Sequence, residues 1–123
     1  MHPFRAAIEA RDLDAAVALL SEDVVFRSPV VFKPYRGRAA VAQILRAVLQ
    51  VFEDFRYVRE IGAEDAADHA LVFQARIGDL RLEGADFLHT GVDGAIDELV
   101  VMIRPLSATV ALATAMQARL AAA

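Results

Sequence analysis

The chain has 123 residues, a net charge of −4 and a hydrophobic content of 57 %. This length suits one domain, which we predict to span residues 1–123. The lack of cysteine excludes disulfides, thiolate metal sites and cysteine nucleophiles, and the negative charge argues against a nucleic-acid partner. Because the apolar content exceeds that of an average domain, we expect a subunit interface or an apolar cavity in addition to the core.

The sequence contains no segment that is typical of membrane insertion or secretion. No apolar run approaches the ~18 residues of a membrane-spanning helix, and Met1 to Arg5 lack the apolar stretch of a signal peptide. We therefore expect a cytosolic protein with no membrane partner. Arginine outnumbers the single lysine, Lys33, and asparagine is absent, which indicates a GC-rich bacterial genome.

The first part of the chain is predicted to form two short helices and a strand. Apolar residues from Phe4 to Leu20 follow a helical period that is interrupted near Asp12, whose carboxylate can cap the second helix. We expect that helix to end over residues 21–23. Residues 24–26 are β-branched and aromatic, so they predict a strand that ends before Pro29.

A loop and a long helix are expected next. Prolines and a glycine punctuate residues 29–37, which predicts a loop. Apolar residues then recur at the spacing of one helix face, and they are Val41, Ile44, Leu45, Val48, Leu49 and Phe52. This is the clearest amphipathic helix of the sequence.

From residue 55 the period changes to two, which predicts antiparallel strands. We expect these strands at residues 55–61, 71–77, 80–89 and 96–103. Gly78 and Asp79 suit a tight hairpin turn, and residues 91–94 suit a second turn. Pro105 ends the last strand, and Ser107 is predicted to cap a terminal helix. Helices followed by a strand meander define an α+β fold.

Asp86 is the main candidate for a functional residue. It shares one face of its strand with Leu82 and Leu88, and we expect that face to point inward. Desolvation there should raise the pKa of the carboxyl group, and perturbed carboxylates in clefts are candidates for catalysis. The alternative is a structural aspartate that is held by a backbone N–H or an arginine, or is turned outward by a bulge at Gly84.

The histidines are weaker candidates. His89 lies three residues from Asp86, which places it on the opposite face of the same strand. We expect His69 to be a solvated residue at a strand end. No spacing of histidine and acidic residues suggests a metal site, and we predict no cofactor.

Three stretches resemble the nuclear-transport-factor-2-like superfamily, which includes ketosteroid isomerases, limonene epoxide hydrolases and SnoaL-type polyketide cyclases. They are residues 10–26, residues 35–41 with Gly37 before the long helix, and residues 85–96 with the Asp93–Gly94 turn. The resemblance implies a single SnoaL-like domain in which a curved sheet wraps around the long helix. It also implies a conical, largely apolar cavity and a homodimer.

Of the three functional groups of ketosteroid isomerases, this chain keeps one. Their proton-shuttling aspartate precedes a proline at the end of the first strand, where this chain has Ser28. Their tyrosine donor in the first helix corresponds to Phe4. Asp86 matches the remaining member, an aspartate on the strand before the last hairpin. The resemblance therefore argues against ketosteroid isomerisation by the usual mechanism.

The other enzymes of the superfamily leave a role for Asp86. Limonene epoxide hydrolases bridge two carboxylates with an arginine; Asp86 with Arg76 or Arg104 would supply part of that set, and no second carboxylate is evident. SnoaL-type cyclases use an acidic residue as a base in an apolar cavity, and Asp86 is the natural analogue.

Further residues are predicted to line the cavity. They are Phe4, Ser28, Tyr35, Phe52, Tyr57, Phe73, Leu99, Val101 and Ile103. Tyr57 is expected to be a core tyrosine with a satisfied hydroxyl. The opposite face of the last strand, with Val100, Met102 and Arg104, is expected to meet a second subunit, and Arg104 is predicted to be an interface residue or a partner of an aspartate.

Three hypotheses for function follow. The first is a protein that binds a small apolar or polycyclic molecule. The second is a cyclase-like or isomerase-like enzyme that uses Asp86 as an acid and base. The third is a non-catalytic dimeric adaptor, which only the fold supports.

Overall fold

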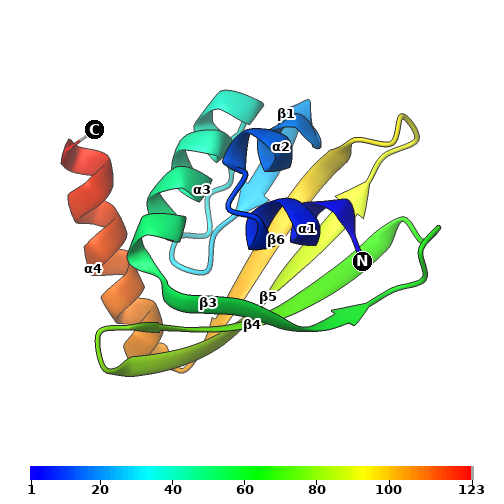
Figure 1. The fold of residues 1–123 in the computed structure, drawn as a ribbon. Coiled ribbons are helices and arrows are strands. Elements are labelled where there is room, and N and C mark those ends of the chain that lie inside the picture. Colours follow the sequence, from blue (N-terminus) through cyan, green and yellow to red (C-terminus); the bar gives the residue numbers. More distant parts are fainter. Residues whose placement is uncertain (123) are drawn as a thin grey trace.

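The fold is built on a six-stranded sheet that curves around one long helix, α3 (Figure 1). The computed structural model describes residues 1–122. The strand order is β2–β1–β6–β5–β4–β3. Strands β1 and β6 run parallel, and every other neighbouring pair is antiparallel. This arrangement confirms the predicted α+β fold.

Ten elements make up the described chain. The strands are β1 (Leu20–Arg27), β2 (Tyr35–Arg36), β3 (Glu53–Ile61), β4 (Asp68–Ile77), β5 (Leu80–Thr90) and β6 (Ile96–Arg104). The helices are α1 (Pro3–Glu9), α2 (Leu13–Ala18), α3 (Arg38–Val51) and α4 (Leu106–Ala122).

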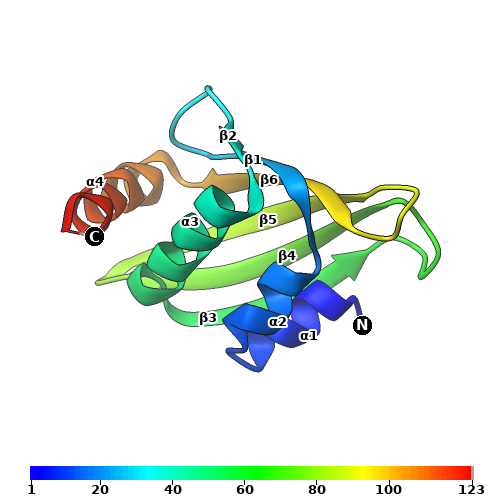
Figure 2. The same ribbon diagram turned by 90° about the horizontal axis from the view of Figure 1, so that it is seen from above.

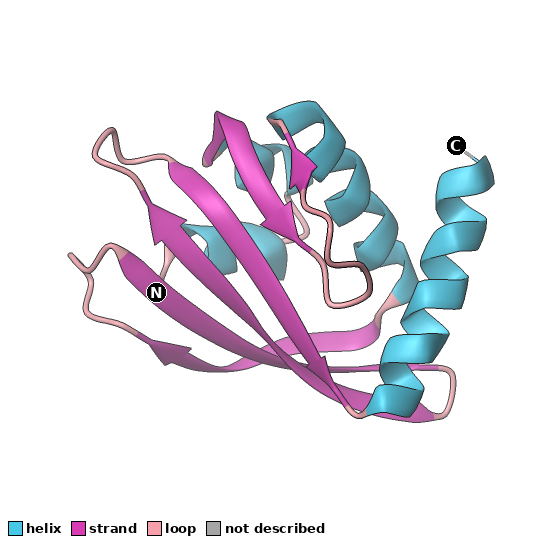
Figure 3. Cartoon of the chain, turned by 180° about the vertical axis from the view of Figure 1, so that it is seen from behind, coloured by secondary structure: helices cyan, strands magenta, loops and turns pink. Residues whose placement is uncertain are grey.

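The helices lie on one side of the sheet or at its end. Helix α3 crosses the concave face, α1 and α2 cover the same face toward one end, and α4 stands at the other end (Figure 2). The opposite face carries none of the described helices (Figure 3). None of the described helices is both long and apolar enough to span a bilayer.

Side chains cap the two N-terminal helices. The Nδ1 atom of His2 accepts a hydrogen bond of 3.0 Å from the backbone N–H of Phe4. As predicted, Asp12 caps α2, because its Oδ1 accepts from the N–H of Ala15 at 3.1 Å. Helix α1 buries Phe4 and Ile8 against the sheet, so this capping fixes part of the inner wall of the fold.

Three local predictions are wrong. Residues 21–23 belong to β1 and do not end a helix, because pairing between Leu20 and Ile96 extends the strand toward the N-terminus. Tyr35 and Arg36 form the short strand β2 by pairing with β1. Ser107 lies inside the first turn of α4, where the carbonyl of Pro105 accepts from the N–H groups of Ala108 and Thr109.

His69 is buried, whereas the sequence predicted a solvated histidine. Strand β4 extends beyond the predicted start to Asp68, so His69 lies in phase with Leu71 and Phe73 and points inward. The side chain is 7 % exposed and its ring lies 4.8 Å from the ring of His2 in an edge-on contact. Its Nε2 lies 2.7 Å from the carbonyl oxygen of Ala63. His69 therefore helps to close the end of the sheet under α1.

Candidate functional site

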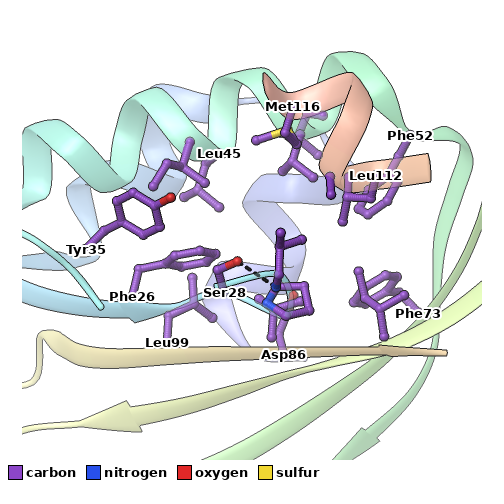
Figure 4. Close-up of a pocket in the computed structure, with 18 of the residues that line it drawn as sticks. Phe26, Ser28, Tyr35, Leu45, Phe52, Phe73, Asp86, Leu99, Leu112 and Met116 are labelled. Atoms are coloured by element: carbon purple, nitrogen blue, oxygen red, sulfur yellow. Dashed lines mark hydrogen bonds between the residues drawn. The ribbon is translucent and has the colours of Figure 1, made fainter. Parts of the chain in front are cut away.

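A cavity of about 610 Å³ lies between the concave face of the sheet, α3 and α4 (Figure 4). The sheet supplies the floor, and α3 supplies the opposite wall through Ile44, Leu45, Val48 and Leu49, with Phe52 directly after its end. The loop after β1 and helix α4 complete the rim. Almost all of this lining is apolar, and its polar side chains are Ser28, Tyr35, Tyr57, Asp86 and Gln117. A cavity of this size and character suits a small organic molecule.

Asp86 lies on the floor of the cavity, on β5. Its neighbours across the sheet are Leu71 on β4 and Val101 on β6. Residues of β5 alternate in direction, so Asp86 points inward together with Gly84 and Leu88, and it is 8 % exposed. The carboxyl group is thus surrounded by apolar residues of the central strands.

Tyr57 on β3 is the hydrogen-bond partner of Asp86. Its hydroxyl donates to Oδ2 of Asp86 at 2.8 Å. No other described residue donates to this carboxyl group, so Oδ1 is left without a protein partner at the cavity wall. The Asp86 carboxyl group therefore has one oxygen, Oδ2, that Tyr57 holds in place and another, Oδ1, that is available to a ligand.

Burial sets the protonation of both groups. It raises the pKa of Asp86 from 3.8 to about 7, against the opposing effect of the Tyr57 hydrogen bond. Burial, with the nearby Asp86 charge, also raises the pKa of Tyr57 far above its ordinary value. Tyr57 consequently remains a donor at every physiological pH, whereas Asp86 exchanges between its neutral and ionised forms near neutrality.

An aromatic cluster holds Tyr57 in place. Its ring packs edge-on against Phe55 at 5.0 Å and Phe73 at 6.3 Å between ring centroids. Phe73 in turn lies over Gly84, where an added Cβ would overlap the Phe73 ring and come within 2.7 Å of the carbonyl oxygen of Met102. The lack of a side chain at Gly84 thus leaves room for the Phe73 ring.

All the residues predicted from the sequence to surround the cavity do lie along it, including Asp86. Contact of these residues with a ligand stays a prediction. Phe4 is fully buried in the wall and presents no donor. Ser28 is the first residue of the rim loop. Its Oγ accepts from the backbone N–H groups of Val30 at 2.9 Å and Val31 at 3.4 Å, and these bonds hold the turn of the loop (Figure 4).

The arginines predicted as possible partners of Asp86 are engaged elsewhere. Arg76 pairs with Asp54 at 2.6 Å and with Glu53 at 2.7 Å. Arg104 pairs with Glu83 at 3.5 Å on the outer face of the sheet. An arginine-bridged pair of carboxylates is therefore not formed at Asp86.

The other titratable candidates lie away from the cavity. His89 points to the opposite face from Asp86, as expected, and its Nδ1 lies 2.6 Å from Oδ1 of Asp97. This carboxylate raises the pKa of His89. Within residues 1–122, no group of three or more histidine or acidic side chains is placed to hold a metal ion.

Two parts of the site were missed in the sequence. The hydrogen bond between Tyr57 and Asp86 joins strands that are separated by β4, so alternation alone does not reveal it. Helix α4 also contributes to the cavity, through Leu112, Ala113, Met116, Gln117 and Leu120. The apolar residues of α4 were visible as a helical pattern, and only the packing of the helix against α3 directs them to the cavity.

The chain belongs to the SnoaL-like domain family, whose model matches residues 2–99. No curated protein sequence matches the chain. The remaining residues include the end of β6 and all of α4.

Solved structures with the same fold include two relatives of high identity. A steroid delta-isomerase from Pseudomonas aeruginosa is 44 % identical over 95 % of this chain and 85 % of its own, with a TM-score of 0.89. An uncharacterized protein with a cystatin-like fold from Silicibacter pomeroyi is 39 % identical over 97 % of this chain and 86 % of its own, with a TM-score of 0.88. The epoxide hydrolase/cyclase-like enzyme SalBIII is 18 % identical over 85 % of this chain and 87 % of its own, with a TM-score of 0.67, and it shares the fold alone.

Replacing Asp86 should make the protein more stable at alkaline pH. The pKa of Asp86 in the folded protein lies above its unfolded value, so the folded state keeps a proton that the unfolded state releases between about pH 4 and pH 7. Stability should therefore fall as the pH rises through this window. We expect Asp86→Asn to raise the free energy of unfolding at pH 8 by up to roughly 4 kcal/mol, and to give no gain near pH 4.

Urea unfolding of both proteins from pH 4 to pH 8 measures this difference. The matched control is Asp79→Asn, which changes an exposed carboxylate in the turn between β4 and β5 and should show no such pH-dependent gain. A gain for Asp86→Asn that is equal at pH 4 and pH 8 would contradict the burial of an ionisable Asp86.

Proposed function

We propose that the protein binds a small, largely apolar molecule in the cavity and holds a hydroxyl or carbonyl oxygen of that molecule at Asp86. The observation that carries this proposal is the free Oδ1 of a buried carboxyl group at the wall of an apolar cavity. When Asp86 is neutral it can donate to a carbonyl oxygen, and when it is ionised it can accept from a hydroxyl. Tyr57 keeps Oδ2 engaged in either state.

The composition of the cavity supports a role in ligand binding more directly than a role in catalysis. Apolar side chains supply most of the contact surface, and burial of the ligand on them supplies most of the binding free energy. One buried polar group then fixes the orientation, because leaving it unpaired against an apolar ligand surface carries a cost. A cytosolic location and a bacterial source stay predictions from the sequence.

Binding can be tested with two matched probes, biphenyl and 4-phenylphenol. Because only the phenol offers a hydroxyl to Asp86, we expect the protein to bind 4-phenylphenol about tenfold more tightly, which corresponds to one hydrogen bond to a buried carboxyl group. Asp86→Leu should remove this preference, and Asp79→Leu should retain it. The measurement is isothermal titration calorimetry, and equal affinity of the unaltered protein for both probes would refute the role of Asp86.

A second candidate function is proton transfer within the bound molecule, with Asp86 as acid and base. A pKa of about 7 favours it, since a general base works best when its pKa lies near the working pH. The name of the Pseudomonas aeruginosa relative, a steroid delta-isomerase, and its 44 % identity also support it. In this reaction the carboxylate would take a proton from a carbon beside a carbonyl group and return it to the same molecule.

Proton transfer can be followed as deuterium uptake by 2-tetralone in deuterium oxide. The active form of Asp86 is the carboxylate, so we expect the protein-dependent rate to rise with pH through about 7. Asp86→Asn should abolish the uptake. Tyr57→Phe removes the hydrogen bond that lowers the pKa of Asp86, so the midpoint of the pH profile should move to higher pH. An unchanged midpoint in that variant would contradict the prediction that the Tyr57 hydrogen bond lowers the pKa of the catalytic Asp86.

We also propose that two copies associate through the outer face of the sheet, which helices of the described chain leave uncovered (Figure 3). Apolar side chains alternate outward on its central strands, and they are Val72, Ala85, Phe87, Val100 and Met102. Phe87 is 40 % and Met102 is 59 % exposed. Ion pairs, such as Arg27 with Glu98 at 3.1 Å, flank this strip. An apolar centre with a charged rim is typical of subunit interfaces.

Sedimentation velocity tests this association. We expect a dimer for the unaltered protein and a monomer for the double variant Phe87→Glu/Met102→Glu, because two carboxylates would be buried at the interface. Val110→Glu places a carboxylate on an equally exposed apolar position of α4 and should leave the dimer intact. A monomer in the unaltered protein at micromolar concentration would contradict the proposal.

A further inference from the structure

The cavity has a second polar group far from Asp86, the hydroxyl of Tyr35. Tyr35 lies on β2 opposite Phe26 of β1, and the two rings pack with their centroids 6.2 Å apart. Its side chain lines the cavity, and its hydroxyl points inward below Leu45 (Figure 4). No described residue forms a hydrogen bond with this hydroxyl. It is therefore a positioned donor and acceptor that the protein itself does not use.

The sheet sets the distance between Tyr35 and Asp86. Their strands are separated by β6 and β1, and three steps of ~4.8 Å place the two backbones roughly 14 Å apart across the sheet. The register adds an offset of two residues, because Asp86 pairs with Val101 whereas Phe26 pairs with Leu99. Both side chains extend toward the cavity, so their polar atoms face the same space from its two sides.

The floor between these two groups is apolar. Phe26, Leu99 and Val101 line it, and none of them offers a side-chain hydrogen bond. Figure 4 shows Phe26 and Leu99 in the interval between Tyr35 and Asp86. A ligand that spans the interval would contact carbon along its middle and meet an oxygen at each end.

We propose that the cavity selects elongated molecules with a polar group at each end, and that Tyr35 is the residue that recognises the end distant from Asp86. The proposal rests on the proposed binding function, because Asp86 must first fix one end of the molecule. The distal group is a hydroxyl or a carbonyl, since the Tyr35 hydroxyl both donates and accepts. A molecule with one polar group would form no hydrogen bond with the Tyr35 hydroxyl and would lack the contribution of that bond to binding.

The other polar side chains near the rim are less suited to this role. The Oγ of Ser28 already accepts from two backbone N–H groups of its own loop. Gln117 is exposed on α4 and has no partner that fixes its amide among the described residues. Tyr35 has a ring that packs on Phe26, so little side-chain freedom is lost when its hydroxyl binds a ligand.

The experiment compares 4-phenylphenol with 4,4′-biphenol, which carries a hydroxyl at each end of the same rigid frame. Symmetry alone gives the second compound an advantage of about twofold, because either end can meet Asp86. We expect a further gain of about three- to tenfold in the unaltered protein from the hydrogen bond to Tyr35. In Tyr35→Phe the ratio of the two dissociation constants should fall to about two.

Two further measurements make the result specific. Asp79→Leu changes a residue outside the cavity and should keep the ratio of the unaltered protein. Thermal unfolding of Tyr35→Phe verifies that the packing of the ring on Phe26 survives. A ratio near two in the unaltered protein, or a ratio that Tyr35→Phe leaves unchanged, would overturn the role of Tyr35 while 4-phenylphenol still binds at Asp86. If neither compound binds, the proposed binding function fails together with this inference.

Discussion

A carboxyl group in an apolar wall must either stay neutral or obtain a hydrogen-bond donor, and Tyr57 is the donor that this fold supplies to Asp86. The other features of the site depend on that one contact. Tyr57 has to come from β3, two strands away, so the order and register of β3, β4 and β5 must hold for the contact to form. The cluster of Phe55, Phe73 and Tyr57 keeps the hydroxyl in position. Because Tyr57 bonds to Oδ2 and not to Oδ1, the carboxyl group has one hydrogen bond that helps it to be buried, while Oδ1 still lacks a hydrogen-bond partner from the protein.

The cavity follows from the way in which the sheet curves around α3. An amphipathic helix normally packs its apolar face directly on a sheet. Here the start of α3 is held on β1, where Nε of Arg38 donates to the carbonyl oxygen of Leu20 at 3.0 Å, and the apolar face of the helix then lines the cavity. At the other end Phe52, the residue after α3, packs on Phe73 with ring centroids 5.8 Å apart. Large aromatic side chains at that end and helix α4 beyond it hold the layers apart. An empty apolar volume lowers stability, and so does a buried carboxyl group with a raised pKa. Both features are expected of a binding site and neither helps the fold.

The sequence predicted the parts of this site that depend on local pattern. The period of two along β5 placed Asp86 on the inner face, and the hairpin residues Gly78 and Asp79 fixed the phase of β4 and β5. Predictions failed where distant contacts decide the outcome. His69 became buried because β4 extends to Asp68, which puts His69 in phase with the inward residues of the strand, and because the ring of His2 packs against it. The partnership of Tyr57 and Asp86 was not foreseen, because irregularities in the pairing of β3 with β4 change the register on both sides of Tyr57. Such a bulge has no clear signature in the residues of β3 themselves.

The differences from ketosteroid isomerases explain why we propose ligand binding as the first candidate function and catalysis as the second. Removing a proton from carbon leaves negative charge on the carbonyl oxygen, and a donor must meet that oxygen for the reaction to be fast. Phe4 offers no donor, and the Tyr57 hydroxyl already donates to Asp86. A hydroxyl has one proton, so Tyr57 cannot stabilise both the carboxylate and a developing oxyanion at once. When Asp86 accepts a proton, however, it loses its charge and holds the Tyr57 hydroxyl less strongly. Catalysis at this site therefore requires Tyr57 to transfer its hydrogen bond as the charge moves from Asp86 to the ligand, whereas binding requires only the arrangement that the structure already has.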